Sequence, residues 1–401
     1  MANVSSSNGL EKRPKLRFPG FDEPYKQCRI GDIYAERSQR GASDMELLSV
    51  TMNDGVKPRS EIEGKDNSSE DKSNYKIVRK GDMVYNSMRM WQGANGISPC
   101  DGIVSPAYTV LMPKQEINNG YFAALFKSAN LINEFRKNSQ GMTSDTWNLK
   151  YPQIETIKVQ IPSVSEQDKV SEMFSVLDER IAAQSQLVES LKKYKRGVVR
   201  TLLSPKRCSI KNVKWTTSRI GDIGTFIKGA PLSKADISLE GTPFILYGEL
   251  YTTYSEVISN VVRRTQASAD KQYYSQIGDV IIPTSGETPE EISTASCVML
   301  PDIILAGDLN IYRCTQVDGR IMSYILNHVV NDRIARIAQG KSVVHVQAAE
   351  ISKIEITYPD PFSQKTIIAI LAAISDRIDQ SNAELRLLHE LRKALLQKLF
   401  I

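Results

Sequence analysis

The chain repeats one sequence plan twice within its 401 residues, and this internal repeat constrains the fold more than any other feature. The segment Arg29–Ile33 returns as Arg219–Ile223, 190 positions later. Lys80–Val84 matches Ile277–Ile281 at an offset of 197, and from Ile157 onward this offset holds without a gap to the last residue. A chain with two such copies is expected to fold into two similar parts in tandem.

Each copy ends in about forty residues whose apolar side chains alternate at spacings of four and three, which is typical of a coiled-coil helix. We expect these helices at 163–204 and 361–401. Two unrelated surface helices are the alternative, but the shared phase of the two seams, polar interruptions included, argues against them. The seam positions predicted to form the spacer and the subunit interface are Val170, Phe174, Leu177, Ile181, Gln184, Leu191, Ile367, Leu371, Ile374, Ile378, Ser381 and Leu388.

Charge predicts how these two helices pair. A parallel, in-register pair would place Lys195 against Arg392 in the seam, where like charges repel each other. An antiparallel pair centred on Gln184 and Ser381 avoids this contact and buries the stem of Lys195 along Ile370. A helix of about 38 residues spans on the order of 57 Å, which approximates the length of about 17 base pairs of DNA.

Outside the helices, each copy mixes short β-branched runs with helical stretches, which indicates one α+β globular domain per copy. We place these domains at 22–162 and 219–360, with an N-terminal arm at 1–21 and a short basic linker at 205–218. The predicted fold class is α+β: two globular α/β domains in tandem repeat, separated by two long helices that form an antiparallel coiled coil with pseudo-two-fold symmetry.

Composition excludes several classes of protein. The longest purely apolar run, Ile367–Ile374, is far shorter than the roughly 20 residues of a membrane span. Residues 1–20 hold no secretory signal, so we expect a cytoplasmic protein. Five scattered cysteines and three histidines lack the spacing of disulfide or metal sites, so we expect no bound metal. A net charge of +5 permits a polyanionic partner without requiring one.

No motif of enzyme catalysis is complete in the sequence. Gly340–Ser342 resembles the end of a phosphate-binding P-loop, but that motif needs a glycine where this chain has Ala335. The methyltransferase signatures N-P-P-[FY] and D-P-P-[FY] do not occur, and Pro301-Asp302 lacks the further residues of a nuclease site. Ser285–Glu287 has no histidine nearby in the sequence for nucleophilic catalysis. We therefore expect no catalytic residue and no cofactor bound by this chain.

The order and duplication of these parts resemble the specificity (S) subunits of Type I DNA restriction-modification systems over essentially the whole chain. Local segments that carry the resemblance are Leu16–Phe21, Gly102–Pro106, Gly278–Ile281, Ser285–Thr288 and Gly340–His345. The resemblance implies that each globular domain is a target recognition domain that reads one half of a bipartite site in double-stranded DNA. It also implies that the paired helices fix the gap between the half-sites.

The same resemblance implies the partners of the chain. The helices would dock two modification (methyltransferase) subunits, and restriction subunits that translocate and cleave DNA would join this core. S-adenosylmethionine, ATP and Mg²⁺ would be bound by those partners, which leaves this chain as a non-catalytic component of a cytoplasmic, nucleoid-associated prokaryotic complex. Whether the system cleaves or only methylates DNA stays open.

Phosphates call for Lys and Arg, and base edges for Arg, Asn, Gln, Ser and Thr, which selects candidate DNA contacts. In the first domain they are Asn86, Ser87, Arg89, Trp91 and Gln92, with Arg89 and Gln92 expected to read bases, and Arg37, Arg40, Lys57 and Arg59 nearer phosphates. In the second domain they are Thr284, Ser285, Glu287 and Thr288, with Lys228, Lys234, Arg263, Arg264, Lys341, Ser342 and His345 as neighbours. The matching pairs Gln140-Gly141 and Gln339-Gly340 fit either a DNA contact or a structural turn, and the turn is preferred.

Two other functions stay open from the sequence. The chain could be a self-sufficient DNA nuclease or methyltransferase, in which case it would turn over substrate alone. It could instead be a two-headed interaction scaffold that does not bind DNA, in which case its complex would lack salt-sensitive DNA binding.

Overall fold

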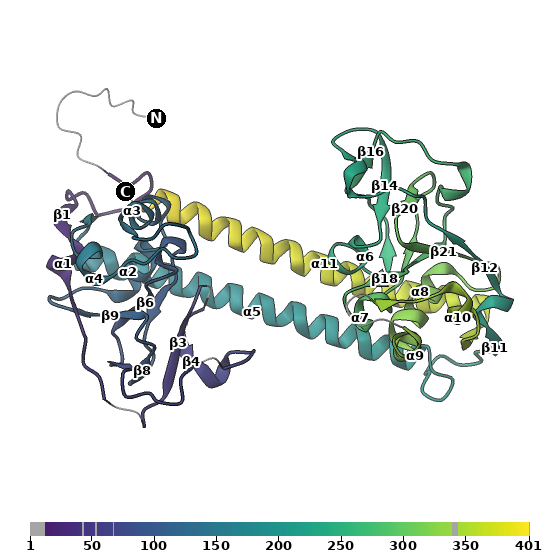
Figure 1. Ribbon diagram of the computed structural model, residues 1–401, viewed down its shortest axis with the longest axis horizontal. Coiled ribbons are helices and arrows are strands. Elements are labelled where there is room, and N and C mark those ends of the chain that lie inside the picture. The colour runs from purple at the N-terminus through teal and green to yellow at the C-terminus, as the bar shows by residue number, and fades with distance from the viewer. Residues whose placement is uncertain (1–12, 42–43, 53, 67, 339–343, 401) are drawn as a thin grey trace. The chain divides into compact units, whose positions relative to one another are not determined.

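A computed structural model describes residues 13–41, 44–52, 54–66, 68–338 and 344–400 (Figure 1). The chain divides into two compact units. Unit 1 comprises residues 1–185 with 383–401, and unit 2 comprises residues 186–382. Each unit therefore contains one globular domain together with parts of both long helices, and each is described by itself below.

The globular domain of unit 1 contains two four-stranded sheets. The first has the order β2-β9-β6-β7, with every neighbouring pair antiparallel, and the second has the order β4-β3-β8-β5, with β3 parallel to β8. Valines from both sheets, including Val84 and Val104, meet in one buried cluster. The strands are β2 (Tyr34–Glu36), β3 (Leu47–Thr51), β4 (Gly55–Pro58), β5 (Lys76–Val78), β6 (Met83–Asn86), β7 (Asn95–Ile97), β8 (Gly102–Val104) and β9 (Tyr108–Pro113).

Helices pack against the face of the first sheet that is turned away from the valine cluster. Asn118 and Ser128 cap the N-termini of α2 and α3 by accepting backbone hydrogen bonds with their side chains. Tyr34 and Phe122 pack edge to face with 5.5 Å between their ring centroids, inside a large aromatic core. The remaining elements are β1 (Lys26–Arg29), which pairs with β10 (Lys158–Ile161), α1 (Ile30–Ile33), η1 (Arg59–Glu61), η2 (Met90–Gln92), α2 (Asn119–Leu125), α3 (Ala129–Asn138) and α4 (Tyr151–Ile154).

Unit 2 repeats this design with additions. Its five-stranded sheet has the order β12-β21-β17-β19-β15, and its first four strands match β2-β9-β6-β7 of unit 1 in order and direction. A second sheet has the order β13-β16-β14-β20, and two short pairs are β11-β23 and β18-β22. The strands are β11 (Trp215–Arg219), β12 (Gly224–Lys228), β13 (Ile237–Ser238), β14 (Thr242–Leu246), β15 (Val257–Ile258), β16 (Arg263–Thr265), β17 (Asp279–Pro283), β18 (Ser285–Gly286), β19 (Ser296–Val298), β20 (Ile304–Ala306), β21 (Leu309–Cys314), β22 (Val344–His345) and β23 (Glu355–Pro359).

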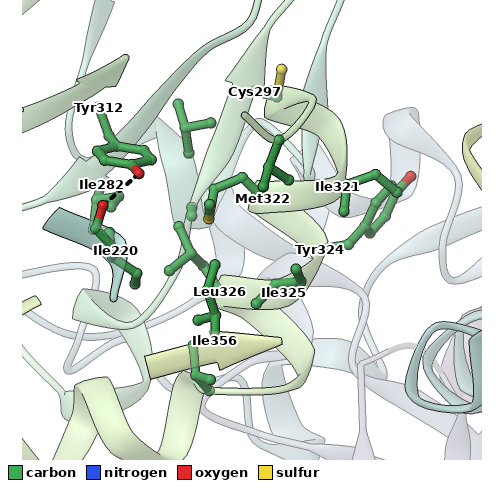
Figure 2. Close-up of a cluster of buried hydrophobic side chains, with 14 of the residues drawn as sticks. Ile220, Ile282, Cys297, Tyr312, Ile321, Met322, Tyr324, Ile325, Leu326 and Ile356 are labelled. Atoms are coloured by element: carbon green, nitrogen blue, oxygen red, sulfur yellow. Dashed lines mark hydrogen bonds between the residues drawn. The ribbon is translucent and has the colours of Figure 1, made fainter. Parts of the chain in front are cut away.

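The main core of unit 2 forms where α8 packs against the five-stranded sheet (Figure 2). Ile321 and Ile325 of this helix are completely buried, and Tyr312 on β21 donates its hydroxyl to the Ile220 carbonyl at 2.8 Å. Helices in this unit are η3 (Ile220–Asp222), η4 (Lys234–Asp236), α6 (Glu249–Thr252), η5 (Lys271–Tyr273), α7 (Pro289–Ile292), α8 (Gly319–His328), α9 (Asn331–Ile337) and α10 (Ala348–Ser352).

The repeated Gly-Asp pair has a structural role in both domains. Gly81 and Gly278 adopt left-handed backbone conformations, with φ of 89° and 94°. The aspartate that follows each glycine is buried, and it accepts hydrogen bonds from an arginine of its own domain and from a backbone N–H three residues upstream. These aspartates and their arginines are Asp82 with Arg37, and Asp279 with Arg313.

Two long helices, α5 (Val164–Leu202) and α11 (Pro361–Lys398), pack together. In unit 1, Phe174 stacks on Phe400, whereas Arg180, further along α5, binds Glu384 at 2.7 Å. The partner number falls as the α5 number rises, so the helices run antiparallel. In unit 2, Val199 of α5 and Leu371 of α11 share one buried core. The predicted fold class is confirmed.

The predicted seam positions lie on the covered faces of these helices. Those that are buried are Val170, Phe174, Leu177, Gln184, Ile367, Leu371, Ile378 and Ser381. Those that are partly buried are Ile181, Leu191, Ile374 and Leu388. The spacing of four and three in the sequence therefore identified the packed side of both helices.

A glutamine near the start of each long helix connects that helix to the globular domain of its own unit. Gln167 accepts from the Asn118 backbone N–H and donates to the Pro162 carbonyl, both at 3.0 Å. Gln364 makes the matching pair of hydrogen bonds in unit 2, with Asp318 and Pro359, at 2.8 Å each. Because Asn118 and Asp318 are the N-caps of α2 and α8, each glutamine ties a long helix to a domain helix.

Candidate nucleic-acid interface

The loop after β6 carries the first group of predicted DNA contacts in unit 1. Asn86 accepts a hydrogen bond from the Met88 backbone N–H at 3.0 Å, and the Ser87 and Thr109 hydroxyls are 2.9 Å apart in a buried contact. The short helix η2 buries Met90 completely, so the loop backbone is anchored to the domain. Of the predicted contacts in this loop, Ser87 is buried, and those that are partly exposed are Asn86, Arg89, Trp91 and Gln92.

A second loop, after α3, packs against this one. Trp147 meets Trp91 edge to face with 5.2 Å between ring centroids, and the Leu149 backbone N–H donates to the Ser87 carbonyl at 2.8 Å. The guanidinium of Arg136, at the end of α3, lies 5.7 Å from the Trp91 ring centroid. Two segments far apart in the sequence therefore form one surface, which sequence patterns alone did not indicate.

The four basic residues predicted near phosphates in unit 1 fall into two groups that differ in their surroundings. Arg37 donates to Asp82 at 2.7 and 3.2 Å, and this hydrogen bond raises the pKa of its guanidinium. Arg59 donates to the carbonyls of Ile62 and Lys65 at 2.5 and 2.7 Å. Arg37 therefore holds the buried Asp82, and Arg59 holds the surface loop that follows it. Of the other two, Arg40 is exposed, whereas Lys57 is partly exposed and forms a surface ion pair with Asp54 at 3.5 Å.

In unit 2 the loop after β17 is joined to a distant segment in the same way. Ser285 and His345 are opposite each other in the β18-β22 pair, and the Val346 backbone N–H donates to the Thr284 carbonyl at 3.0 Å. This last hydrogen bond matches the one from Leu149 in unit 1 at an offset of 197 for both partners. The Ser285 hydroxyl donates to Asp308 at 2.9 Å, so a carboxylate holds it in place.

The other predicted contacts of unit 2 have mixed surroundings. Thr288 caps α7 by accepting from the Glu291 backbone N–H at 3.2 Å, and Arg263 and Arg264 hydrogen bond to Glu249 and to the Gly241 carbonyl. Lys341 and Ser342 lie outside the described residues. The exposed members of the predicted set in this unit are Lys228, Lys234, Arg263, Arg264, Glu287, Thr288 and His345.

A buried charged cluster joins α5 to the globular domain of unit 2. Glu256 binds Lys195 Nζ through Oε2 and His328 Nε2 through Oε1, both at 2.7 Å. Burial by itself would raise the pKa of the Glu256 carboxyl, but hydrogen bonds from His328 and Lys195 and the Lys195 charge outweigh it and lower the pKa to about 2. The sequence predicted burial of Lys195 along Ile370 and missed this acidic partner.

The described part of the chain holds no group of three or more His, Cys, Asp and Glu residues placed to bind a metal ion. All five cysteines are free thiols, and burial raises the pKa of Cys297 to about 12, which disfavours its reactive thiolate. None of the helices in this part is sufficiently long and apolar to cross a membrane.

Both copies of the repeat match one known family. The model of the Type I restriction modification DNA specificity domain matches residues 23–193 and again residues 212–389. The chain belongs to the family of Type I restriction-modification specificity subunits. It is thus the non-catalytic DNA specificity component of a Type I system, and the resemblance stated from the sequence is confirmed. Both alternatives, a self-sufficient enzyme and a scaffold without DNA binding, are set aside.

Solved structures share the fold of this specificity subunit. The Type I S subunit from M. genitalium is 15% identical, with a TM-score of 0.59 over 97% of this chain and 99% of that chain. A chain from a structure on complex assembly and conformational transition of the type I R-M system is 14% identical, with a TM-score of 0.60 over 95% of this chain and 98% of that chain. A comparison with curated protein sequences gave no match.

Proposed function

We propose that this specificity subunit reads a bipartite target in double-stranded DNA, with one half-site for each globular domain. Residues 22–162 and 219–360 would be the two target recognition domains, joined by the linker 205–218. The observation that carries this proposal is the repeated recognition surface. In each domain the loop after the Gly-Asp strand is tied by a backbone hydrogen bond to a loop that returns from a distant helix. Two similar but non-identical readers suit a split, non-palindromic site.

Within these surfaces we assign base reading to Arg89 and Gln92, which are partly exposed on an anchored loop. Arg40 and Lys57 are the better placed phosphate contacts in unit 1, because Asp82 holds Arg37 and backbone carbonyls hold Arg59, whereas the surface ion pair of Lys57 with Asp54 is weak. In unit 2 the remaining predicted residues supply both kinds of contact: Lys228, Lys234, Arg263, Arg264, Thr284, Ser285, Glu287, Thr288, Lys341, Ser342 and His345.

We assign the spacer to the long helices. The 39 residues of α5 and the 38 residues of α11 each correspond to a rod of about 58 Å. An added heptad lengthens such a rod by about 10 Å, close to three base pairs. Inserting one heptad into both helices is therefore expected to lengthen the spacer of the methylated motif, and an unchanged spacer would contradict this assignment.

The same helices would dock two modification subunits. The large apolar side chains that are exposed on α5 and α11 are Val176, Leu187, Tyr194, Phe362, Ile370, Leu387 and Leu391. Scattered apolar residues are ordinary on a protein surface, whereas contiguous apolar patches mark protein contacts. We take these side chains as the candidate contacts because both helices that carry them are assigned to docking. Restriction subunits would join the assembled core. S-adenosylmethionine, ATP and Mg²⁺ are assigned to the partner subunits, and the complex to the nucleoid of a prokaryotic cytoplasm, where its DNA lies.

Reconstitution tests this proposal directly. The purified chain alone should transfer no methyl group, whereas with its modification subunits and S-adenosylmethionine it should direct adenine methylation at a split site. Methylation by the modification subunits that ignores the presence of this chain would contradict the proposal.

A further inference from the structure

The loop after α3 in unit 1 holds a fixed conformation of its own. Gln140 and Asn148 exchange two backbone hydrogen bonds, at 3.0 and 2.8 Å, which close the base of the loop. The Thr146 hydroxyl accepts from the Thr143 backbone N–H at 3.1 Å and donates to the Thr143 carbonyl at 2.9 Å. A braced loop loses little conformational entropy on binding, which favours a role in recognition.

The glycine of the repeated Gln-Gly pair is required for this conformation. Gly141 has a φ of 145°, and a Cβ built there would lie 2.6 Å from the Thr146 carbonyl oxygen. The turn suggested by the sequence is therefore present at Gln140-Gly141, whereas Gln339-Gly340 lies outside the described residues. The next residue, Met142, is 100% exposed to solvent.

The surroundings of this loop indicate what it contacts. Trp147 packs the loop against Trp91, which belongs to the proposed base-reading loop, and Arg136 adds positive charge beside the Trp91 ring. One exposed methionine is ordinary on a protein surface. The loop itself carries one charge, that of the exposed Asp145, and the nearby positive charge comes from Arg136 of α3. A fully exposed apolar side chain on a braced loop, next to a reading loop and an arginine, matches the apolar contacts that proteins make with thymine methyl groups and base steps.

We propose that residues 140–147 form a second DNA-reading loop of the first domain, in which Met142 makes an apolar contact with bases of the half-site and Arg136 lies against an adjacent phosphate. This inference rests on the proposed function and adds to it a contact that the sequence interpreted as a structural turn. The ligand is the groove of double-stranded DNA within the half-site of unit 1. Met142 is then a specificity-determining residue of this domain.

The test uses the complex of the full chain with its modification subunits. Met142→Ala should weaken binding to the recognised site about tenfold, as expected when a buried apolar contact is lost, and should make the methylated motif degenerate in one half-site only. Met142→Asp should weaken binding further, because its charge opposes the phosphates. Ile277→Ala is the matched control: it truncates an apolar side chain that is 62% exposed in unit 2, just before β17 and therefore at the opposite end of that strand from the predicted contacts, and it should leave the motif unchanged.

The two levels of the proposal fail in different ways. If the wild-type complex methylates no bipartite motif, the proposed function is wrong. If the wild-type complex methylates a bipartite motif and both Met142 variants keep its affinity and its sequence, the second reading loop is wrong. Because Met142 is fully exposed, these substitutions leave the folded domain intact, which circular dichroism of the variants checks.

Discussion

Lys195 and Arg392 occupy matching seam positions of the two long helices, 197 residues apart, and each is neutralised by an acid within its own unit. Lys195 binds Glu256 of the globular domain at 2.7 Å, whereas Arg392 binds Asp178 of α5 at 2.5 Å. Each cation also lies over an aromatic ring, that of Tyr324 or Phe174. These two basic seam residues therefore attach their helices to a neighbouring element, the globular domain for Lys195 and α5 for Arg392. The Lys195 contact gives the first testable prediction.

Removing the acid from the Lys195 pair should destabilise unit 2. Glu256→Gln leaves the ammonium of Lys195 buried without its counter-charge, which costs about 3–5 kcal/mol of unfolding free energy. Glu189→Gln is the control, because it removes an exposed ion pair with Lys192 on the same helix and should cost less than about 1 kcal/mol. Urea unfolding measures both, and equal losses for the two variants would refute the importance of the buried pair.

The same carboxyl predicts an acid-sensitive component of stability. The pKa of Glu256 in the folded chain is about 2, below its ordinary value of 4.5. A lowered folded-state pKa means that the ionised carboxylate stabilises the fold above about pH 4.5 and that this contribution, on the order of 3 kcal/mol, disappears as the pH falls toward 2. The stability difference between wild type and Glu256→Gln should shrink over this window. A difference that stays constant from pH 5 to pH 2 would contradict the assignment.

The matching hydrogen bonds of Gln167 and Gln364 should contribute equally to the stability of their units. Gln167→Ala and Gln364→Ala each remove a buried hydrogen bond to a proline carbonyl and a part-buried one from a backbone N–H, so each should lower the unfolding free energy by about 2 kcal/mol. Gln186→Ala, at an exposed position of α5, should change it by less than about 0.5 kcal/mol. Thermal unfolding of the three variants checks this. If Gln364→Ala left the stability unchanged while Gln167→Ala lowered it, the two copies of the contact would not be energetically equivalent.

Base and phosphate contacts can be separated by substitution in unit 1. Arg89→Ala should cost about 1–3 kcal/mol of specific binding and relax the motif at one position of one half-site. Lys57→Ala should weaken binding to all sequences alike and lower the slope of log affinity against log salt by about one. Titrations with specific and unrelated DNA at several salt concentrations distinguish the two patterns. Uniform weakening by Arg89→Ala would remove it from the base readers.

Docking of the modification subunits can be tested on an exposed helix position. Leu387 on α11 is 65% exposed, so Leu387→Asp should leave the chain folded. The new charge should lower co-purification of the modification subunit at least tenfold if this position is buried in the complex. Glu390→Gln, an exposed polar substitution one turn away, is the control. Undiminished co-purification of Leu387→Asp would place the docking surface elsewhere.

Helix positions were the most predictable part of this molecule from sequence. A seam that runs from Val170 to Leu399 is a local, periodic signal, and the repeat doubles it. The repeated Gly-Asp pair was also visible in the sequence. Its structural role was not, because the arginine that binds Asp82 is 45 residues away in the sequence.

Contacts between distant segments escaped prediction for the same physical reason. Two examples are the contact of Trp91 with Trp147 and that of Lys195 with Glu256. Both depend on how strands and helices pack in three dimensions, and no periodic pattern in the sequence predicts either one. The Gln140-Gly141 pair was interpreted as a turn, which it is. The full exposure of Met142 required three-dimensional geometry.

Single-molecule sequencing of the host methylome, with and without the gene for this chain, tests the central claim most directly. The account predicts a split motif, with a fixed spacer and a methylated adenine on each strand, that is present only when the chain is present. A methylome that is identical in the two strains, or a chain-dependent motif without a spacer, would contradict it.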